Sequence, residues 1–163
     1  MNTNLTGGLF KLKFKALGTV CEVQFRAASV EIAKEFRKLA LGWLRDFENR
    51  WSRFKPTSLL CRINAEAGRS MVDLTEADEE ILKVCEHTFQ ISGSLNDPTS
   101  LPLTSLWDRA GKEDRMPSSG EIEEAKNLIS WPAVEWGDGR VFLPEKGMAL
   151  EIGGFGKEYA VDR

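Results

Sequence analysis

The chain has 163 residues and a formal net charge of −3, and its 42% hydrophobic and 29% charged residues are typical of a soluble globular protein. This length can bury a hydrophobic core, and we expect one domain over residues 1–163. The small, dispersed charge argues against a nucleic-acid-binding surface. No apolar run reaches the roughly 18 residues of a membrane helix. Residues 1–8 lack the basic start and apolar core of a signal peptide, so we expect a cytoplasmic protein without a membrane segment.

Two strands are predicted near the N-terminus. Apolar and polar residues alternate over residues 10–16 and again over residues 21–26, which is the period of a half-buried strand. Because Gly18 lies between the two runs, we expect a hairpin or neighbouring antiparallel strands.

A long helix is predicted from about Val30 to Trp51, with Ser29 as its N-cap. Its apolar residues recur at helical spacing in a continuous stripe, so we expect it to be the main core helix. Pro56 ends any helix before it, and one or two short helical turns are expected at residues 59–63.

A second long helix is predicted after Thr75, which together with Asp78 has the spacing of a helix cap. It is expected to end at Ser92–Gly93. The single histidine, His87, has no nearby nucleophile or second histidine, and we interpret it as a surface or packing residue. The cysteines are far apart and are interpreted as free thiols, not as a zinc site or a disulfide framework: Cys21, Cys61 and Cys85.

Residues 92–107 predict an ordered loop, with a turn at Asn96–Thr99 and several leucines as anchors. Asp97 is either a ligand-binding carboxylate on a stiff loop or part of a plain polar turn, and the pattern leaves both readings open. Residues 108–118 are expected to be irregular. A third helix is predicted with Ser119 as its cap, followed by a hairpin around Gly137–Gly139.

Residues 148–163 predict a buried strand, a glycine-rich turn and the start of a helix. Leu150 and Ile152 are the apolar residues of the strand, and Gly153 and Gly154 break it. Such a helix N-terminus is suited to a phosphate or another anion, but a tight structural connection explains the same glycines.

Strands and helices are mixed without strict βαβ alternation. We therefore expect an α+β fold with a mostly antiparallel sheet packed with three helices.

Four stretches, taken together, resemble the ApbE family of FAD-dependent protein flavin (FMN) transferases. Their order and spacing along nearly the whole chain carry the resemblance, which covers roughly the N-terminal half of a family member. Leu17–Thr19 resembles the family's Met-Gly-Thr, Trp51–Asn64 its Ser-x-Tyr/Phe…Ser-x-x-Ser-x-x-Asn block, Ser92–Trp107 its Ser-Gly-Gly-x-Phe-Asp-Pro-Thr-x-x-Pro-Leu-x-x-Leu-Trp, and Glu151–Asp162 its Asp-x-Gly-Gly-x-x-Lys-Gly-Tyr-Ala-x-Asp.

The resemblance implies binding of FAD and a divalent metal, usually Mg²⁺. It also implies transfer of FMN to a threonine of a target flavoprotein with release of AMP, or hydrolysis of FAD to FMN and AMP. It makes Gly154 a metal ligand through its backbone carbonyl. The cofactor-binding residues that it implies are Leu17, Phe54, Asn64, Leu95, Asn96, Asp97, Glu151 and Lys157.

Five positions depart from the family's pattern, and two of these changes are acidic. Glu151 replaces an aspartate and Glu158 replaces a glycine, near the expected place of an anionic cofactor. The half of the family's sequence that carries the metal-binding aspartate and threonine is also missing from the match. Two alternatives follow. The chain is either part of an enzyme and inactive by itself, or a degenerate non-catalytic protein or half-subunit that pairs with another chain or a second copy. The other three departures are Leu17, Ser94 and Asn96.

Overall fold

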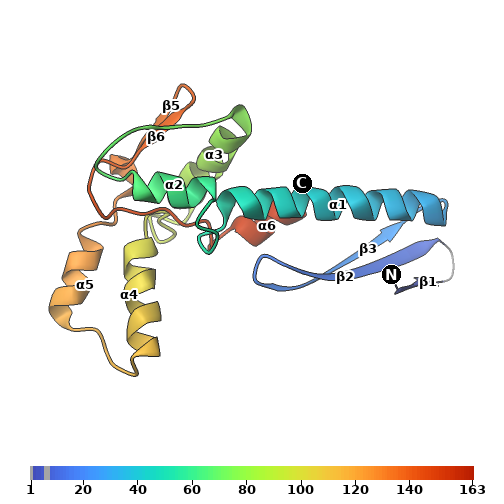
Figure 1. The fold of residues 1–163 in the computed structure, drawn as a ribbon, viewed down its shortest axis with the longest axis horizontal. Coiled ribbons are helices and arrows are strands. Elements are labelled where there is room, and N and C mark those ends of the chain that lie inside the picture. The colour runs from blue at the N-terminus through green and yellow to red at the C-terminus, as the bar shows by residue number, and fades with distance from the viewer. Residues whose placement is uncertain (1, 6–7) are drawn as a thin grey trace. The chain divides into compact units, whose positions relative to one another are not determined.

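The computed structural model describes residues 2–5 and 8–163 (Figure 1). The chain divides into two compact units, one ending at Ser52 and one formed by Arg53–Arg163. The first contains β1 (Asn2–Leu5), β2 (Leu9–Ala16), β3 (Thr19–Arg26) and α1 (Val30–Trp51). The second contains α2 (Leu59–Ala65), β4 (Val72–Asp73), α3 (Glu76–Ile91), α4 (Leu101–Lys112), α5 (Ser119–Lys126), the 3₁₀ turn η1 (Trp131–Ala133), β5 (Glu135–Gly137), β6 (Arg140–Phe142) and α6 (Gly156–Val161).

The first unit is a three-stranded antiparallel sheet in the order β1-β2-β3, with α1 beside it. The predicted hairpin of β2 and β3 is confirmed. Leu17 and Gly18 form its two-residue turn with φ of 52° and 70°, the left-handed backbone that matches the twist of the flanking strands. The ring of Phe25 on β3 lies 4.3 Å from that of Phe36 on α1, which packs the helix against the sheet.

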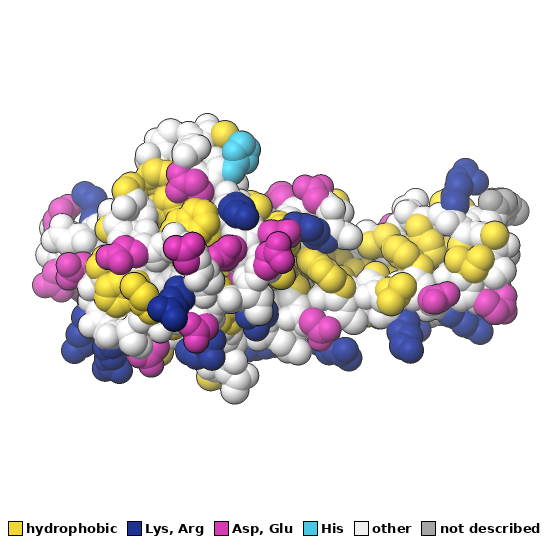
Figure 2. Space-filling view, turned by 90° about the horizontal axis from the view of Figure 1, so that it is seen from above, with side chains coloured by type: hydrophobic (Ala, Val, Ile, Leu, Met, Phe, Trp, Pro, Cys, Tyr) yellow, Lys and Arg dark blue, Asp and Glu magenta, His cyan; other side chains and the backbone are white. Residues whose placement is uncertain are grey.

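Helix α1 spans the predicted residues, and the Ser29 side chain caps it by accepting a hydrogen bond from the Ile32 N–H. Its apolar stripe is not buried throughout, so the expectation of a main core helix is wrong for part of it. Ala33 is fully buried, whereas Ile32 is 50% and Leu39 66% exposed. Seen from above in Figure 2, hydrophobic side chains remain visible on this unit. A period of 3.6 residues predicts the helix but does not tell how wide a face its neighbours cover.

The second unit holds another three-stranded antiparallel sheet, in the order β4-β6-β5. The predicted hairpin is confirmed, with Asp138 and Gly139 at its turn. The cap of α3 is confirmed as well, because the Asp78 carboxylate accepts hydrogen bonds from the N–H and the hydroxyl of Thr75. The core of this unit is formed by large buried side chains, among them Leu60, Ile63, Ile81, Leu82, Trp131, Val141, Leu143 and Leu150.

Two elements of this unit differ from the sequence-based expectation. Residues 101–112 form α4, where we expected a leucine-anchored loop followed by irregular chain, and α4 lies beside α5 (Figure 1). The turn at Asn96–Thr99 suggested that the loop continued, but α4 begins at Leu101. Pro102 lies in its first turn, where the missing N–H costs nothing. The cap of α5 is Ser118 and not Ser119, because the Ser118 hydroxyl accepts from the Glu121 N–H. The α+β class is confirmed, with six α-helices in the described chain in place of three and two small antiparallel sheets.

The expectations for the histidine and the cysteines are confirmed. His87 lies exposed on α3. All three cysteines are free thiols, with Cys85 buried and Cys21 and Cys61 partly exposed.

Candidate functional site

The segment that precedes the glycine turn is held by a side chain and not by a strand. The Asn64 amide of α2 donates to the Leu150 carbonyl at 3.0 Å and accepts from the Leu150 N–H at 2.8 Å. Residues 148–152 therefore form no strand in the structure, and the predicted buried strand is wrong. Leu150 and Ile152 are nevertheless buried. The apolar spacing thus predicted burial correctly, while the backbone partner is the amide of Asn64.

The loop before α4 meets this segment directly. The N–H of Glu151 donates to the Pro98 carbonyl at 2.8 Å. A side-chain Cβ added at Gly154 would lie 2.7 Å from Oδ1 of Asn96, closer than real Cβ atoms approach a neighbour. The absence of a Cβ at Gly154 thus leaves room for the end of the Asn96 side chain in this position. The segments around Asp97 and Gly153 are brought together, as the implied site requires.

The carboxylate of Asp97 holds the loop in shape. Its Oδ1 accepts from the N–H of Thr99 at 2.7 Å and from the Thr99 hydroxyl at 2.6 Å. Its Oδ2 accepts from the Trp131 N–H at 3.2 Å. The fully buried Thr99 in turn accepts from the Ser130 N–H. These bonds support the reading of Asp97 as part of a polar turn, and its contact with a cofactor stays a prediction.

Glu151 lies over the first turn of α4. Its Oε1 accepts from the Thr104 hydroxyl at 2.6 Å and from the Ser100 hydroxyl at 3.2 Å. Its Oε2 lies 3.8 Å from Nε of Arg53, and the side chain is only 14% exposed. The extra length of glutamate relative to aspartate is thus taken up by contacts with α4.

Arg53 connects Glu151 to an exposed aromatic ring. Its guanidinium lies 4.6 Å from the ring centroid of Phe54 and pairs with Asp108 at 3.1 Å. Phe54 is 78% exposed and Leu95 is 92% exposed. Both side chains are therefore accessible to a ligand.

Two further implied cofactor-binding residues belong to α6 and to the turn between β2 and β3. Lys157 is exposed on α6, just past the glycine turn. Leu17 belongs to the other compact unit, where its N–H donates to the Glu48 carboxylate at 2.7 Å. Its role toward a cofactor stays a prediction.

Three residues of this site were missed by sequence reasoning: Ser100, Thr104 and Arg53. The available signal was the serine at residue 100 before an apolar pattern at Leu101, Leu106 and Ala110, which fits a capped helix. Had α4 been predicted, Ser100 and Thr104 would have stood on its first turn.

The predicted metal ligand is the backbone carbonyl of Gly154. Within residues 2–5 and 8–163, no three histidine, cysteine, aspartate or glutamate side chains gather as a metal would require. Mg²⁺ prefers octahedral oxygen coordination that includes carboxylates. Glu151 is the carboxylate nearest in the chain to the glycines. Its Oε1 is held by Thr104 and Ser100, which leaves a single carboxylate oxygen, Oε2, at the glycine turn. The donors present therefore do not fit Mg²⁺ on their own. Across the same residues, none of the helices combines the length and apolar character of a membrane span.

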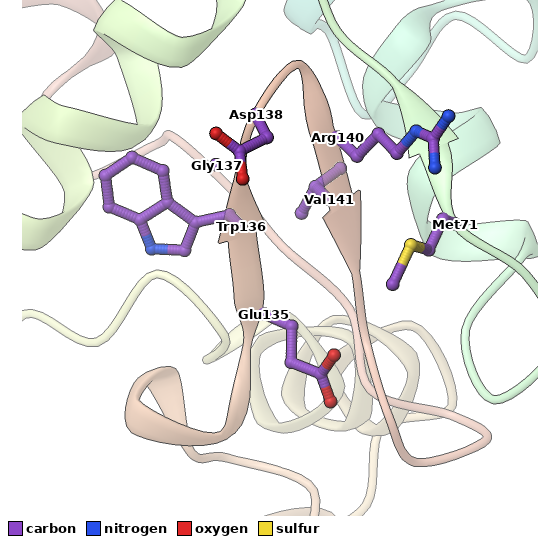
Figure 3. Close-up of a pocket in the computed structure, with 7 residues that line it drawn as sticks. All are labelled: Met71, Glu135, Trp136, Gly137, Asp138, Arg140 and Val141. Atoms are coloured by element: carbon purple, nitrogen blue, oxygen red, sulfur yellow. The ribbon is translucent and has the colours of Figure 1, made fainter.

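A separate hollow of about 490 Å³ lies beside the hairpin of β5 and β6 (Figure 3). It is lined by Met71, residues 135–138 and residues 140–141, and by none of the implied cofactor residues. Arg140 there pairs with Asp73 at 3.5 Å. The hollow is thus distinct from the cluster around Glu151 and Asn96.

Comparisons with known proteins agree on one family. A crystal structure of the ApbE protein from Thermotoga maritima matches with a TM-score of 0.84 and 25% identity, over 95% of this chain and 50% of that chain. The flavin transferase ApbE from Vibrio cholerae matches with a TM-score of 0.83 and 14% identity, over 94% of this chain and 51% of that one. The apo form of the Pseudomonas stutzeri flavinyl transferase ApbE matches with a TM-score of 0.79 and 20% identity, over 94% and 50%.

The chain therefore spans about half the length of the solved structures it matches. No curated protein sequence matches it. The sequence pattern of the ApbE family matches residues 17–163, which include the glycine turn, the loop before α4 and the hairpin turn at Leu17. On this match the chain belongs to the ApbE family.

Proposed function

We propose that this chain supplies the FAD-binding part of a metal-dependent flavin transferase, which moves FMN from FAD to a threonine of a target flavoprotein. One observation carries the proposal. The loop at residues 92–100 and the turn at Gly153–Gly154 lie in contact, through Asn96 and the Pro98 carbonyl, and both belong to the stretch matched by the family.

Each implied residue has a role that its environment supports. Phe54 and Leu95 offer exposed apolar surface to a flavin or adenine ring. Lys157 is an exposed cation for the phosphates. Asn64 and Asp97 act through the backbone that they hold, because their side chains already bond to Leu150, Thr99 and Trp131 in the structure.

Asn96, Glu151 and Leu17 complete the proposed cofactor contacts, and the Gly154 carbonyl is the proposed contribution to a metal site. When bound, FAD supplies the FMN group and its pyrophosphate bond. The residues of this chain bind and orient it. Because the described donors do not fit Mg²⁺ alone, the remaining metal ligands have to come from polypeptide corresponding to the other half of the matched structures.

A second candidate is a non-catalytic FAD-binding protein or half-subunit. It is favoured by the carboxylates of Asp97 and Glu151, which are both bound to donors of the protein itself. Such a chain would bind FAD but release no AMP.

Titration calorimetry with FAD tests the proposed site. We expect saturable binding by the unaltered chain, and a Phe54→Ala variant should bind about tenfold more weakly, since stacking on an aromatic ring is worth roughly 1–3 kcal/mol. Met71→Ala is the matched control, because Met71 is also a large exposed apolar residue but lines the separate hollow. FAD binding that is absent, or equally reduced in both variants, would contradict the proposed site.

Release of AMP from FAD in the presence of Mg²⁺ separates the two candidates. AMP formed by the chain, alone or with the remaining half of the fold, supports the transferase or the hydrolase. Binding of FAD without AMP under either condition supports the non-catalytic reading.

A further inference from the structure

The two oxygens of the Glu151 carboxylate have different surroundings. Oε1 accepts hydrogen bonds from Thr104 and Ser100 at 2.6 and 3.2 Å. Oε2 lies toward the exposed Gly153, where an added Cβ would stand 3.6 Å from it. Its nearest described cationic group is the Arg53 guanidinium at 3.8 Å, beyond ordinary hydrogen-bond distance. Oε1 is thus held by two hydroxyls, whereas Oε2 forms the longer ion pair with Arg53 and lies at the glycine turn.

The hydroxyl of Thr104 fixes the orientation of the Glu151 carboxylate. It has a single proton, and two acceptors lie within reach: the Ser100 carbonyl at 3.2 Å and Oε1 at 2.6 Å. The shorter contact to the charged oxygen is the stronger hydrogen bond. Thr104 therefore donates to Glu151 and fixes the rotation of its carboxylate, which would otherwise turn about a soft terminal torsion.

The chemistry of Oε2 restricts what it can recognise. An ionised carboxylate only accepts hydrogen bonds, and the phosphates of a dinucleotide are acceptors too, so direct contact between them would be repulsive. The group that suits Oε2 is a hydroxyl donor. In FAD these donors are the hydroxyls of the ribityl chain and of the ribose.

We propose that Thr104 is a positioning residue of the cofactor site, which fixes Glu151 so that Oε2 accepts a hydrogen bond from a ribityl or ribose hydroxyl of FAD. This inference rests on the proposed function and deepens it. It assigns the contact at Glu151 to a sugar-type hydroxyl and leaves the phosphates to Lys157.

The test is FAD affinity of Thr104 variants, measured by calorimetry beside thermal unfolding. Thr104→Val keeps the shape but removes the hydroxyl, and FAD binding should weaken about tenfold, as expected for loss of a bond to a charged group. Thr104→Ser should restore affinity to within about twofold. Ser105→Ala, at an exposed position of the same helix, should bind like the unaltered chain. Binding of inorganic pyrophosphate should not change in Thr104→Val.

A double-mutant cycle with Glu151→Gln keeps the inference testable if Thr104→Val unfolds. The glutamine puts an N–H₂ donor where an acceptor is needed. Thr104→Ala, which removes the hydroxyl without adding a methyl group, should weaken binding about tenfold by itself, but Thr104→Ala/Glu151→Gln should bind as weakly as Glu151→Gln alone. Where Thr104→Val folds, adding it to Glu151→Gln should also cause no further loss.

Each contrary result has a distinct meaning. Unaltered FAD affinity in Thr104→Val, additive losses in the cycle, or weaker pyrophosphate binding would overturn the positioning role alone. Failure of the unaltered chain to bind FAD would overturn both this inference and the proposed function.

Discussion

Replacing Asn64 by alanine should destabilise the unit formed by residues 53–163. The substitution leaves the N–H and the carbonyl of Leu150 without the partners that lie at 2.8 and 3.0 Å, and Leu150 is only 1% exposed. An unsatisfied buried group costs roughly 1–3 kcal/mol. Asn64 itself is half-buried, so water reaches part of the gap, and we expect a total loss of about 3 kcal/mol.

Thermal and urea unfolding measure this loss. For a chain of this size each kcal/mol lowers the midpoint by about 2–4 °C, so the midpoint should fall by about 6–12 °C. Asn64→Asp keeps an acceptor for the Leu150 N–H but turns a carboxylate toward the Leu150 carbonyl, and at neutral pH it should be at least as destabilising. Asn127→Ala is the control, because Asn127 is exposed and its truncation should cost less than about 0.5 kcal/mol.

One result would refute this reasoning. If Asn64→Ala weakens FAD binding but leaves the unfolding midpoint unchanged, Asn64 contacts the cofactor and does not hold the backbone. A loss of stability in which FAD binding weakens only in proportion to the unfolded fraction supports the structural role.

Three other predictions concern separate features of the chain. Gly154→Ala would place a Cβ 2.7 Å from Oδ1 of Asn96. Because this oxygen is the end of a side chain that can rotate, we expect only a small fall in the unfolding midpoint, which should disappear in an Asn96→Ala background; simple additivity would contradict the contact. Arg115, followed by the N–H and hydroxyl of Ser118, lowers the pKa of Glu121 from 4.5 to about 2. Stability from Glu121 is therefore present above its ordinary pKa and is lost as the pH falls from about 4.5 to about 2. At pH 7 the Glu121→Gln variant should unfold at a lower temperature than the unaltered chain, and near pH 2 the two midpoints should coincide. The exposed Glu124→Gln control should show no such pH-dependent difference. A difference for Glu121→Gln that persists at pH 2 would exclude the ion pair as its cause. Burial raises the pKa of the Cys85 thiol, so a thiol reagent should modify Cys85 only when the chain unfolds, which mass spectrometry can detect. If Cys85 of the native chain is labelled as fast as Cys61, that result would contradict the burial of Cys85.

The local elements were predictable wherever short-range rules decide them. The two hairpins follow from alternation and from turns at Gly18 and at Asp138–Gly139, and α1 and α3 follow from caps at Ser29 and Thr75. Helix α4 was missed because residues 92–107 were interpreted as one loop around the turn at Asn96–Thr99, although a proline in the first turn, here Pro102, is compatible with a helix.

Contacts between distant residues were not predictable from the pattern. Leu150 and Ile152 have the spacing of a strand, but the backbone partner of Leu150 is a side chain 86 residues away. Sequence resemblance brought the loop at residues 92–100 and the glycine turn into one site. It gave no hint that Glu151 bonds to Thr104, because that contact depends on the packing of α4.

The two hydrogen bonds between the Asn64 side chain and the Leu150 backbone also affect the order of folding. Contacts this far apart in sequence form slowly, because the intervening chain must lose much of its freedom before they can close. Residues 148–152 should consequently acquire protection from hydrogen exchange after α2 and α3. A chain emerging during synthesis would complete this glycine turn only once nearly all of the unit is available to receive it.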